Sequence, residues 1–424
     1  MTALALGCTP PPDALDDGGS DTTDDASEAG SETEGESFAL TYHRDVRPIL
    51  ARHCVGCHVD GGIAPFRLDD AESVVPFADL IVAATADRSM PPYGADNGGE
   101  CNTFRDARWL ADDELATLAT WAELGAPEGD PASAPADPPP PEGLDGELRT
   151  LEMAAPYTPS DELEDDYRCF VIEGAAPAGT DTYVTGFDVH PGNPEIVHHV
   201  IVWAPRNAGA VDQARALDEA EAGEGYTCFG TAQVAASVVA AWAPGGVPSR
   251  YPEGIGVPLL ADAPLIVQMH YNTLAGPDMQ DQTSIDLRVV EGGVTPARFA
   301  AIADLGLALP PGEPSVGTTH TAALAGPNAG VPLRVHGVFP HMHTLGRNLE
   351  LSSQDGDTCL IRVPRYQFHW QLLYFYDEPV DLPADQILSL TCDYDTTTRA
   401  ETTHWGEGTM DEMCIAGLLV SDIR

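Results

Sequence analysis

The chain has 424 residues, more than one ordinary hydrophobic core can organise, and this length predicts two or three domains. Hydrophobic residues make up 43% of it, so most of the chain can fold, and its 41 glycines and 37 prolines favour β-sandwiches joined by turns. The formal net charge of -47 argues against nucleic acid and anionic membrane surfaces as partners, because like charges repel.

The chain opens with a short apolar stretch, MTALALGC, that lacks the basic residues of a signal peptide. It resembles the end of a lipoprotein signal, in which cleavage before Cys8 leaves that cysteine to be acylated; the alternative is a tail with an incidental cysteine. Residues 10–37 are rich in Asp, Glu, Ser, Thr and Gly and cannot bury a core. We therefore interpret residues 1–37 as a lipoprotein-like tail and disordered acidic linker, and expect an exported protein in the periplasm or on the cell surface.

Residues 38–130 predict a small all-α domain. Apolar residues recur at helical spacing within residues 41–54, and a second helical stretch covers residues 70–85. The third, at residues 110–127, begins with acidic residues and ends near Gly125, as helices commonly do.

A C-x-x-C-H motif, CVGCH, lies inside this helical block. The thiols of Cys54 and Cys57 can add to the two vinyl groups of a haem, and His58 then serves as the proximal iron ligand. A C-x-x-C pair alone would also suit a redox pair or half a zinc site, but the trailing histidine favours covalently bound haem c. Met90, in RSMPPY, is the candidate second axial ligand, against the alternative of a core methionine. The block resembles class I c-type cytochromes, and a Met/His ligand pair suits electron transfer.

A proline-rich stretch then predicts an extended linker, which we place at residues 131–150. The rest of the chain predicts two all-β sandwiches, at residues 151–295 and 296–424. Their strand candidates are residues 182–189, 196–204, 265–273, 284–290, 332–341, 348–353, 387–394 and 414–420.

Two adjacent histidines, His198 and His199, interrupt one β-branched run, PEIVHHVIVW. Consecutive side chains of a regular strand point to opposite faces, so a regular strand would separate the two rings. Two imidazoles in succession among residues that cannot compensate a buried polar ring suggest a shared ligand. Both can reach one metal ion only if the strand is twisted or bulged there, or if different ring nitrogens are used.

Other candidate metal ligands follow along the chain. They are His270 in VQMHYNT, His341 and His343 in FPHMHTLG, and Met410 and Met413 in GTMDEMC. Residues i and i+2 of a strand share a face, so the two histidines of the H-x-H pair can hold one ion. Three histidines would suit Cu, Zn, Fe or Ni, whereas two histidines and a thioether favour copper, because soft sulfur selects Cu(I). A single strand histidine is more often structural, and we leave the following as structural: His43, His53, His190, His320 and His336.

The ordered set H-H, Q-x-H-Y, H-x-H-x-x-G and T-H-x-G…D-E-M-C resembles the copper type II ascorbate-dependent monooxygenases, from about Tyr167 to the C-terminus. The family includes peptidylglycine α-hydroxylating and dopamine β-monooxygenases. The resemblance implies two jelly-roll-like sandwiches after the cytochrome-like domain, with one copper ion in each and a solvent cleft between them. It implies an electron-transfer copper on His198, His199 and His270. It implies a copper where oxygen binds and a C–H bond is hydroxylated on His341, His343 and Met413.

The resemblance also implies disulfides and supporting roles. Cys169 would pair with Cys228, and Cys392 with Cys414, whereas Cys101 and Cys359 either bridge each other or leave a free thiol. Met413 is preferred to Met410 because it occupies the Met of DEMC, and His404 would support the site without binding metal.

The chain departs from the peptide-hydroxylating members where those hold the substrate carboxylate. Their arginine two residues before H-x-H is Phe339 here, and their asparagine and tyrosine after DEMC are Ile415 and Gly417. Together with the acidic surface, this favours a neutral or cationic substrate.

The sequence therefore predicts a copper monooxygenase that acts on a small organic substrate with O₂, with electrons from ascorbate or another donor. The fused haem suggests a built-in relay through the first copper to the second. The alternative is a non-catalytic haem and copper electron-transfer or copper-binding protein; a zinc hydrolase would leave Met413 unexplained.

Overall fold

The structure is a computed structural model, and it describes residues 40–60, 64–136, 143–160, 165–243, 246–273, 278–324, 330–368, 370–406, 408 and 410–423. The expected tail and lipid anchor at Cys8 lie outside these residues. Among the residues described, no helix combines the length and apolar character needed to cross a membrane.

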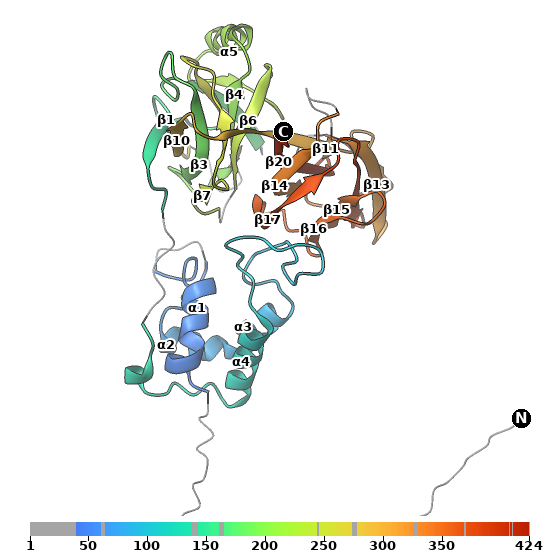
Figure 1. The fold of residues 1–424 in the computed structure, drawn as a ribbon. Helices are drawn as coiled ribbons and strands as arrows, with labels where there is room; N and C mark the ends of the chain where they lie inside the picture. Colours follow the sequence, from blue (N-terminus) through green and yellow to red (C-terminus); the bar gives the residue numbers. More distant parts are fainter. Residues whose placement is uncertain are drawn as a thin grey trace, which may run out of the picture. The chain divides into compact units, whose positions relative to one another are not determined.

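The helices of the first block form where the sequence predicts them (Figure 1). Leu50, Leu118 and Trp121 are among the side chains that form their common core. The last long helix ends just before Gly125, whose φ of +82° lies in the left-handed region that glycine tolerates. The elements are η1 (Tyr42–Val46), α1 (Arg47–His53), α2 (Ala71–Val74), η2 (Val75–Phe77), α3 (Ala78–Ala86), α4 (Asp112–Glu123) and η3 (Pro131–Ser133).

The first sandwich packs a five-stranded sheet, in the order β5-β2-β9-β4-β6, against strands β1, β10, β3, β8 and β7. Partly buried and buried residues alternate along β10, whereas nearly every residue of β9 is buried. The strands are β1 (Glu147–Glu152), β2 (Asp165–Ile172), β3 (Thr182–His190), β4 (Val197–Pro205), β5 (Tyr226–Thr227), β6 (Ala236–Trp242), β7 (Ser249–Arg250), β8 (Ile255–Pro258), β9 (Leu265–Asn272) and β10 (Ser284–Glu291).

The second sandwich packs a four-stranded sheet, β13-β18-β15-β16, against the strands β11, β20, β14 and β17. A short antiparallel pair, β12 with β19, forms a separate two-stranded sheet. The strands are β11 (Thr295–Ala303), β12 (Ala308–Leu309), β13 (Val316–Ala323), β14 (Leu333–His341), β15 (Gly346–Ser353), β16 (Cys359–Val363), β17 (Tyr374–Leu382), β18 (Ile387–Tyr394), β19 (Thr403–His404) and β20 (Ile415–Asp422).

One nine-stranded sheet runs through both sandwiches, which the sequence analysis did not predict. The join is a parallel pairing of β8 with β11, in which Thr295 lies opposite Ile255 and Pro296 opposite Gly256. The predicted boundary at residue 295 coincides with the first residue of β11. The two sandwiches are therefore connected by backbone hydrogen bonds as well as by the chain.

A helix within the first sandwich also differs from the sequence expectation of strands alone. It is α5 (Ala208–Ala220), which begins after Asn207, whose side chain caps the backbone N–H of Ala210. Its buried face is made of Ala210, Val211 and Ala214.

Three disulfides link six of the eight described cysteines, all except Cys54 and Cys57. The pairs Cys169–Cys228 and Cys392–Cys414 confirm the expected pairing. The third resolves an open alternative, because Cys101 bridges Cys359 across 258 residues of sequence. It joins the loop after α3 to the first residue of β16.

Gly225 provides a test of this packing. Its φ is +72°, and a Cβ there would lie 2.5 Å from the carbonyl oxygen of Cys169, whereas Gly223, at φ +95°, has nothing within 4 Å. A left-handed residue other than glycine costs about 1–2 kcal/mol, so both alanine variants lose stability. Overpacking adds about 1–3 kcal/mol at Gly225 only. Urea unfolding should therefore show Gly225→Ala to be less stable than Gly223→Ala, and equal losses would contradict the close contact.

A β-bulge in β14 buries His336. The register shifts between Val335 and Gly337 on both sides of the strand, and the extra residue, His336, bonds Ser421 Oγ through Nε2 at 2.8 Å. Burial lowers the pKa of His336 to about 4, and Arg334 and Arg105 act in the same direction against Asp381.

Between pH 6.5, the ordinary pKa of histidine, and about pH 4, His336 is therefore protonated in the unfolded chain and neutral in the folded protein. The stability contribution of neutral His336 is present above that window and is lost as the pH falls through it. Urea unfolding of the copper-free protein at stepped pH should show a steeper loss for the wild type than for His336→Gln. Parallel curves would show that His336 does not titrate in this way.

Candidate metal centres

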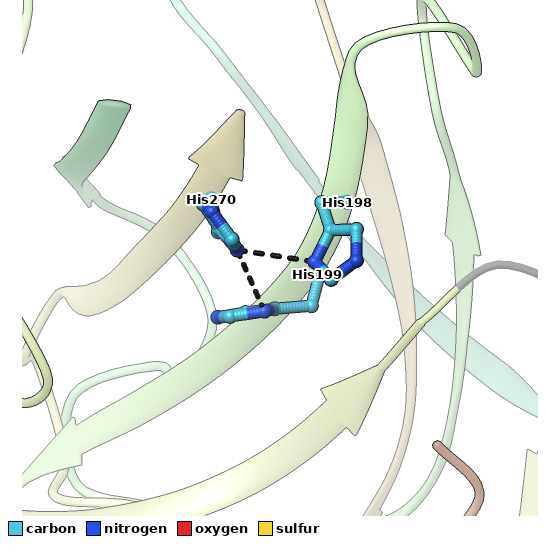
Figure 2. A group of neighbouring side chains, drawn as sticks. All are labelled: His198, His199 and His270. Carbon is cyan, nitrogen blue, oxygen red and sulfur yellow. Dashed lines mark hydrogen bonds between the residues drawn. The ribbon is translucent and has the colours of Figure 1, made fainter. Parts of the chain in front are cut away.

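Three imidazoles from two neighbouring strands meet in the first sandwich, and we call them the N-terminal triad: His198 and His199 from β4, and His270 from β9 (Figure 2). The β4–β9 register moves from Val197 opposite Tyr271 to His199 opposite His270, so His198 is the extra residue of a bulge. The expected distortion of the strand is thereby confirmed. It allows both adjacent rings to face the ring of His270.

The Nδ1 atoms of the triad converge. His270 Nδ1 lies 3.1 Å from His198 Nδ1 and 3.1 Å from His199 Nδ1. Nitrogens about 2.0–2.1 Å from one ion at roughly tetrahedral angles would stand about 3.3 Å apart. The spacing of the triad thus fits ligands of a single metal ion.

Asp165 decides which nitrogen of His270 faces the triad. Its Oδ1 lies 2.9 Å from His270 Nε2, and a carboxylate can only accept, so Nε2 carries the proton. The Nδ1 of neutral His270 then presents a lone pair toward the other two rings. Tyr167 stacks on the face of the His270 ring, with ring centroids 4.1 Å apart and an interplanar angle of 7°.

The surroundings of the triad favour the neutral form of His199. Burial, and then the neighbouring His270 and His198, hold the pKa of His199 well below its ordinary value. Neutral imidazole is the form that binds metals, so the site is prepared for a cation rather than for protons.

His341 and His343, which we call the C-terminal pair, lie at the end of β14 with ring centroids 5.1 Å apart. His343 Nδ1 lies 3.2 Å from the backbone oxygen of Asp411, and His341 Nδ1 lies 2.7 Å from Gln371 Oε1. Both partners accept, so both Nδ1 atoms carry protons and both Nε2 atoms have lone pairs. Burial lowers the pKa of His341 to about 3, and that of His343 also falls.

Glu412 ties Met413 to this pair. Its buried carboxylate accepts from the backbone N–H groups of His343, Leu345 and Met413. Met413 is itself only 8% exposed, and the disulfide of Cys414 holds the following residue. Met410, the alternative thioether, is 63% exposed. Burial raises the pKa of Glu412 to about 7, against the three backbone donors and Arg399.

Family models identify what these sites belong to. The model of the copper type II ascorbate-dependent monooxygenase N-terminal domain matches residues 151–277, and that of the C-terminal domain matches residues 302–419. Together they cover more than half of the chain.

The chain belongs to this family of copper type II monooxygenases. The N-terminal triad lies within the first matched domain, and the C-terminal pair with Met413 lies within the second. The fit of the triad to one metal ion agrees with a copper-binding family.

Similar proteins carry the names of hydroxylating enzymes. A tyramine beta-hydroxylase of Caenorhabditis briggsae is 25% identical over 346 residues, which are 74% of this chain and 54% of that protein. A dopamine beta-hydroxylase of Rattus norvegicus is 25% identical, over 64% of this chain and 46% of its own. A peptidyl-glycine alpha-amidating monooxygenase A of Xenopus laevis is 25% identical, over 62% and 27%. The chain thus spans about half or less of the length of these curated relatives.

The C-x-x-C-H motif of this family member lies outside both matched domains. The thiols of Cys54 and Cys57 are not joined in a disulfide, and burial raises the pKa of Cys54 to about 12. His58 is 8% exposed, and its Nδ1 lies 3.0 Å from the carbonyl oxygen of Phe66, which leaves Nε2 with the lone pair. Met90 lies beyond α3 and is 38% exposed.

Sequence reasoning missed the residues that orient the candidate ligands, namely Asp165, Gln371 and Glu412. Asp165 and Gln371 carry no signal of their own, because they contact histidines about 105 and 30 residues away in the sequence. Glu412 lies inside the D-E-M-C motif, so its place beside Met413 was a usable signal. His404, expected to support the site, is exposed, and its backbone oxygen accepts from the N–H of Glu412.

Asp165→Asn should weaken metal binding by the triad. Loss of a residue that orients a metal-ligating histidine commonly costs about 10–100-fold in affinity. Competition with a Cu(I) chelator should show that loss for one of the bound copper ions. Asp286→Asn is the matched control. Asp286 Oδ2 lies 3.1 Å from His190 Nε2, and neither residue belongs to the triad. Equal affinities of Asp165→Asn and wild type would show that the Asp165 contact does not orient His270.

Proposed function

We propose that the chain uses two copper ions and O₂ to hydroxylate a C–H bond of a small organic substrate. One ion is held by His198, His199 and His270, and the other by His341, His343 and Met413. Bound copper would supply one-electron redox chemistry, which these side chains lack. The observation that carries the proposal is the convergence of three Nδ1 atoms within the triad.

The two sites differ in the donors that they offer. The triad presents three imidazole nitrogens, whereas the C-terminal pair presents two Nε2 atoms and shares the acceptor Glu412 with the backbone of Met413. A sulfur ligand stabilises Cu(I) and so favours a site where O₂ is reduced. This division supports electron transfer at the triad and hydroxylation at His341, His343 and Met413.

The residues around the C-terminal pair support a substrate without a carboxylate. Phe339 lies beside His341, with ring centroids 6.2 Å apart and an angle of 11°. Gly417 lies opposite Phe339 in the β14–β20 ladder, and a side chain there would lie against Phe339. The aromatic ring of Phe339 and the net charge of -47 favour small neutral or cationic aromatic substrates such as tyramine.

A covalent haem c on Cys54 and Cys57, with His58 and Met90 as axial ligands, would supply electrons to the copper sites. The orientation of His58 supports this, since its Nδ1–H donates to Phe66 and its Nε2 remains for iron. The disulfide Cys101–Cys359 supports a relay, because it attaches the loop beyond Met90 to the second sandwich.

Further bonds fasten the same loop to the second sandwich. Gly94 N donates to Tyr374 Oη at 3.2 Å, and Asp96 N donates to the carbonyl oxygen of Arg362 at 2.8 Å.

Three disulfides suit an oxidising compartment, so we also propose an exported protein, with a lipid anchor at Cys8.

Met413→Ile tests the assignment. It should lower kcat/KM by more than about 100-fold, since even residues that only orient metal ligands contribute 10–100-fold, while the triad keeps its copper. The measurements are copper and haem per chain, and O₂ consumption with ascorbate and tyramine, together with detection of hydroxylated product. Met410→Ile is the matched control, because that thioether is 63% exposed.

The outcomes separate the candidate functions. Two copper ions per chain without product from tyramine, phenethylamine or a glycine-extended peptide would favour a non-catalytic electron carrier. Full activity of Met413→Ile would contradict the role of Met413. One haem per chain with no copper would leave only the cytochrome part of the proposal.

A further inference from the structure

The ring of Phe368 lies against histidines of both candidate copper sites. It stacks on His198 of the triad, with centroids 4.9 Å apart and an interplanar angle of 29°. It also meets His343 of the C-terminal pair at 6.0 Å and 76°. Because His198 belongs to the first sandwich and His343 to the second, a single side chain touches ligands of both.

Phe368 is held firmly to the C-terminal pair. Gln371 accepts from His341 Nδ1 through its oxygen and donates through its nitrogen to the backbone oxygen of Phe368 at 2.8 Å. Tyr366 Oη donates to the carbonyl oxygen of Met342 at 2.6 Å and accepts from the N–H of Met342 at 2.9 Å. Tyr366, Phe368 and Gln371 are thus fixed to the strand end that carries both histidines.

Phe229 brings a second part of the first sandwich close to the second. Phe229, which follows Cys228 in the first sandwich, packs edge-on against Tyr167 at 4.9 Å. A Cβ at Gly408, shortly before Met413, would lie 4.0 Å from Phe229 Cζ. Tyr167 in turn stacks on His270, so a row of rings runs from the triad to Phe229.

We propose that Phe368 is a positioning residue that sets the separation of the two copper ions. This inference rests on the proposed function, because it requires a copper ion at both sites. Two facing cations repel, and water between their ligands would let the sites move apart. The Phe368 ring occupies the place between His198 and His343, and Gln371 and Tyr366 restrict its backbone. Because electron transfer weakens with distance, a fixed separation would keep the passage of electrons between the sites efficient.

The test is the distance between the two ions. Wild type and Phe368→Ala are loaded with Cu(II), copper is counted per chain, and pulsed dipolar EPR gives the Cu–Cu distance distribution. We expect a narrow distribution for wild type and a broader one, shifted to longer distances, for Phe368→Ala. Phe368→Tyr, which keeps the ring, should restore the wild-type distribution.

The control is Phe339→Ala, which removes an aromatic ring beside His341 on its own strand and should keep the wild-type distribution. If Phe368→Ala does not fold, Phe368→Leu removes the stacked ring while it retains apolar volume. An unchanged distribution in a two-copper variant without the ring overturns the inference and leaves the proposed function intact. A wild type that holds fewer than two copper ions overturns the proposed function itself.

Discussion

Three imidazole nitrogens that face one another in a largely buried place create the constraint on which the candidate site depends. The proton of His270 is committed to Asp165, so its Nδ1 offers a lone pair to His198 and His199, and it lies 3.1 Å from each. One lone pair cannot satisfy two neighbours as well as a cation can satisfy all three. The bulge in β4 that brings His198 round is therefore a feature of the site and not a defect of the strand.

The two sites choose different nitrogens by the same device, a hydrogen-bond acceptor at the far side of the ring. A carboxylate at His270 Nε2 exposes Nδ1, whereas a carbonyl oxygen at His343 Nδ1 exposes Nε2. The Nε2 atom stands farther from the backbone, so the C-terminal pair extends its donors farther from its strand. The ordering of each site thus depends on residues that bind no metal themselves.

Much of the fold and of the candidate site could be predicted because the signals were local. The period of apolar residues identified the helices around Leu50 and Leu118, and β-branched runs identified β4, β9 and β14. Two adjacent histidines on a strand called for a twist, a bulge or different ring nitrogens, and the structure has a bulge. The pairing of Cys169 with Cys228 followed from the family resemblance.

The features that were missed depend on contacts between distant residues. The parallel pairing of β8 with β11 and the bond from Asp165 to His270 join segments that carry no mutual signal in one sequence. Helix α5 is the exception, because its signal is local: Ala210, Val211 and Ala214 recur at helical spacing along its buried face.

The bridge from Cys101 to Cys359 has a consequence for biosynthesis. The whole sheet of β5, β2, β9, β4 and β6 lies within the loop that it closes. Cys101 leaves the ribosome long before its partner, and Cys169 and Cys228 both emerge before Cys359 does. Early formation of the Cys169–Cys228 bond would bury both of those sulfurs and protect Cys101 from the wrong partner, so oxidation in chain order suits the first sandwich and a delayed, long-range oxidation completes the molecule.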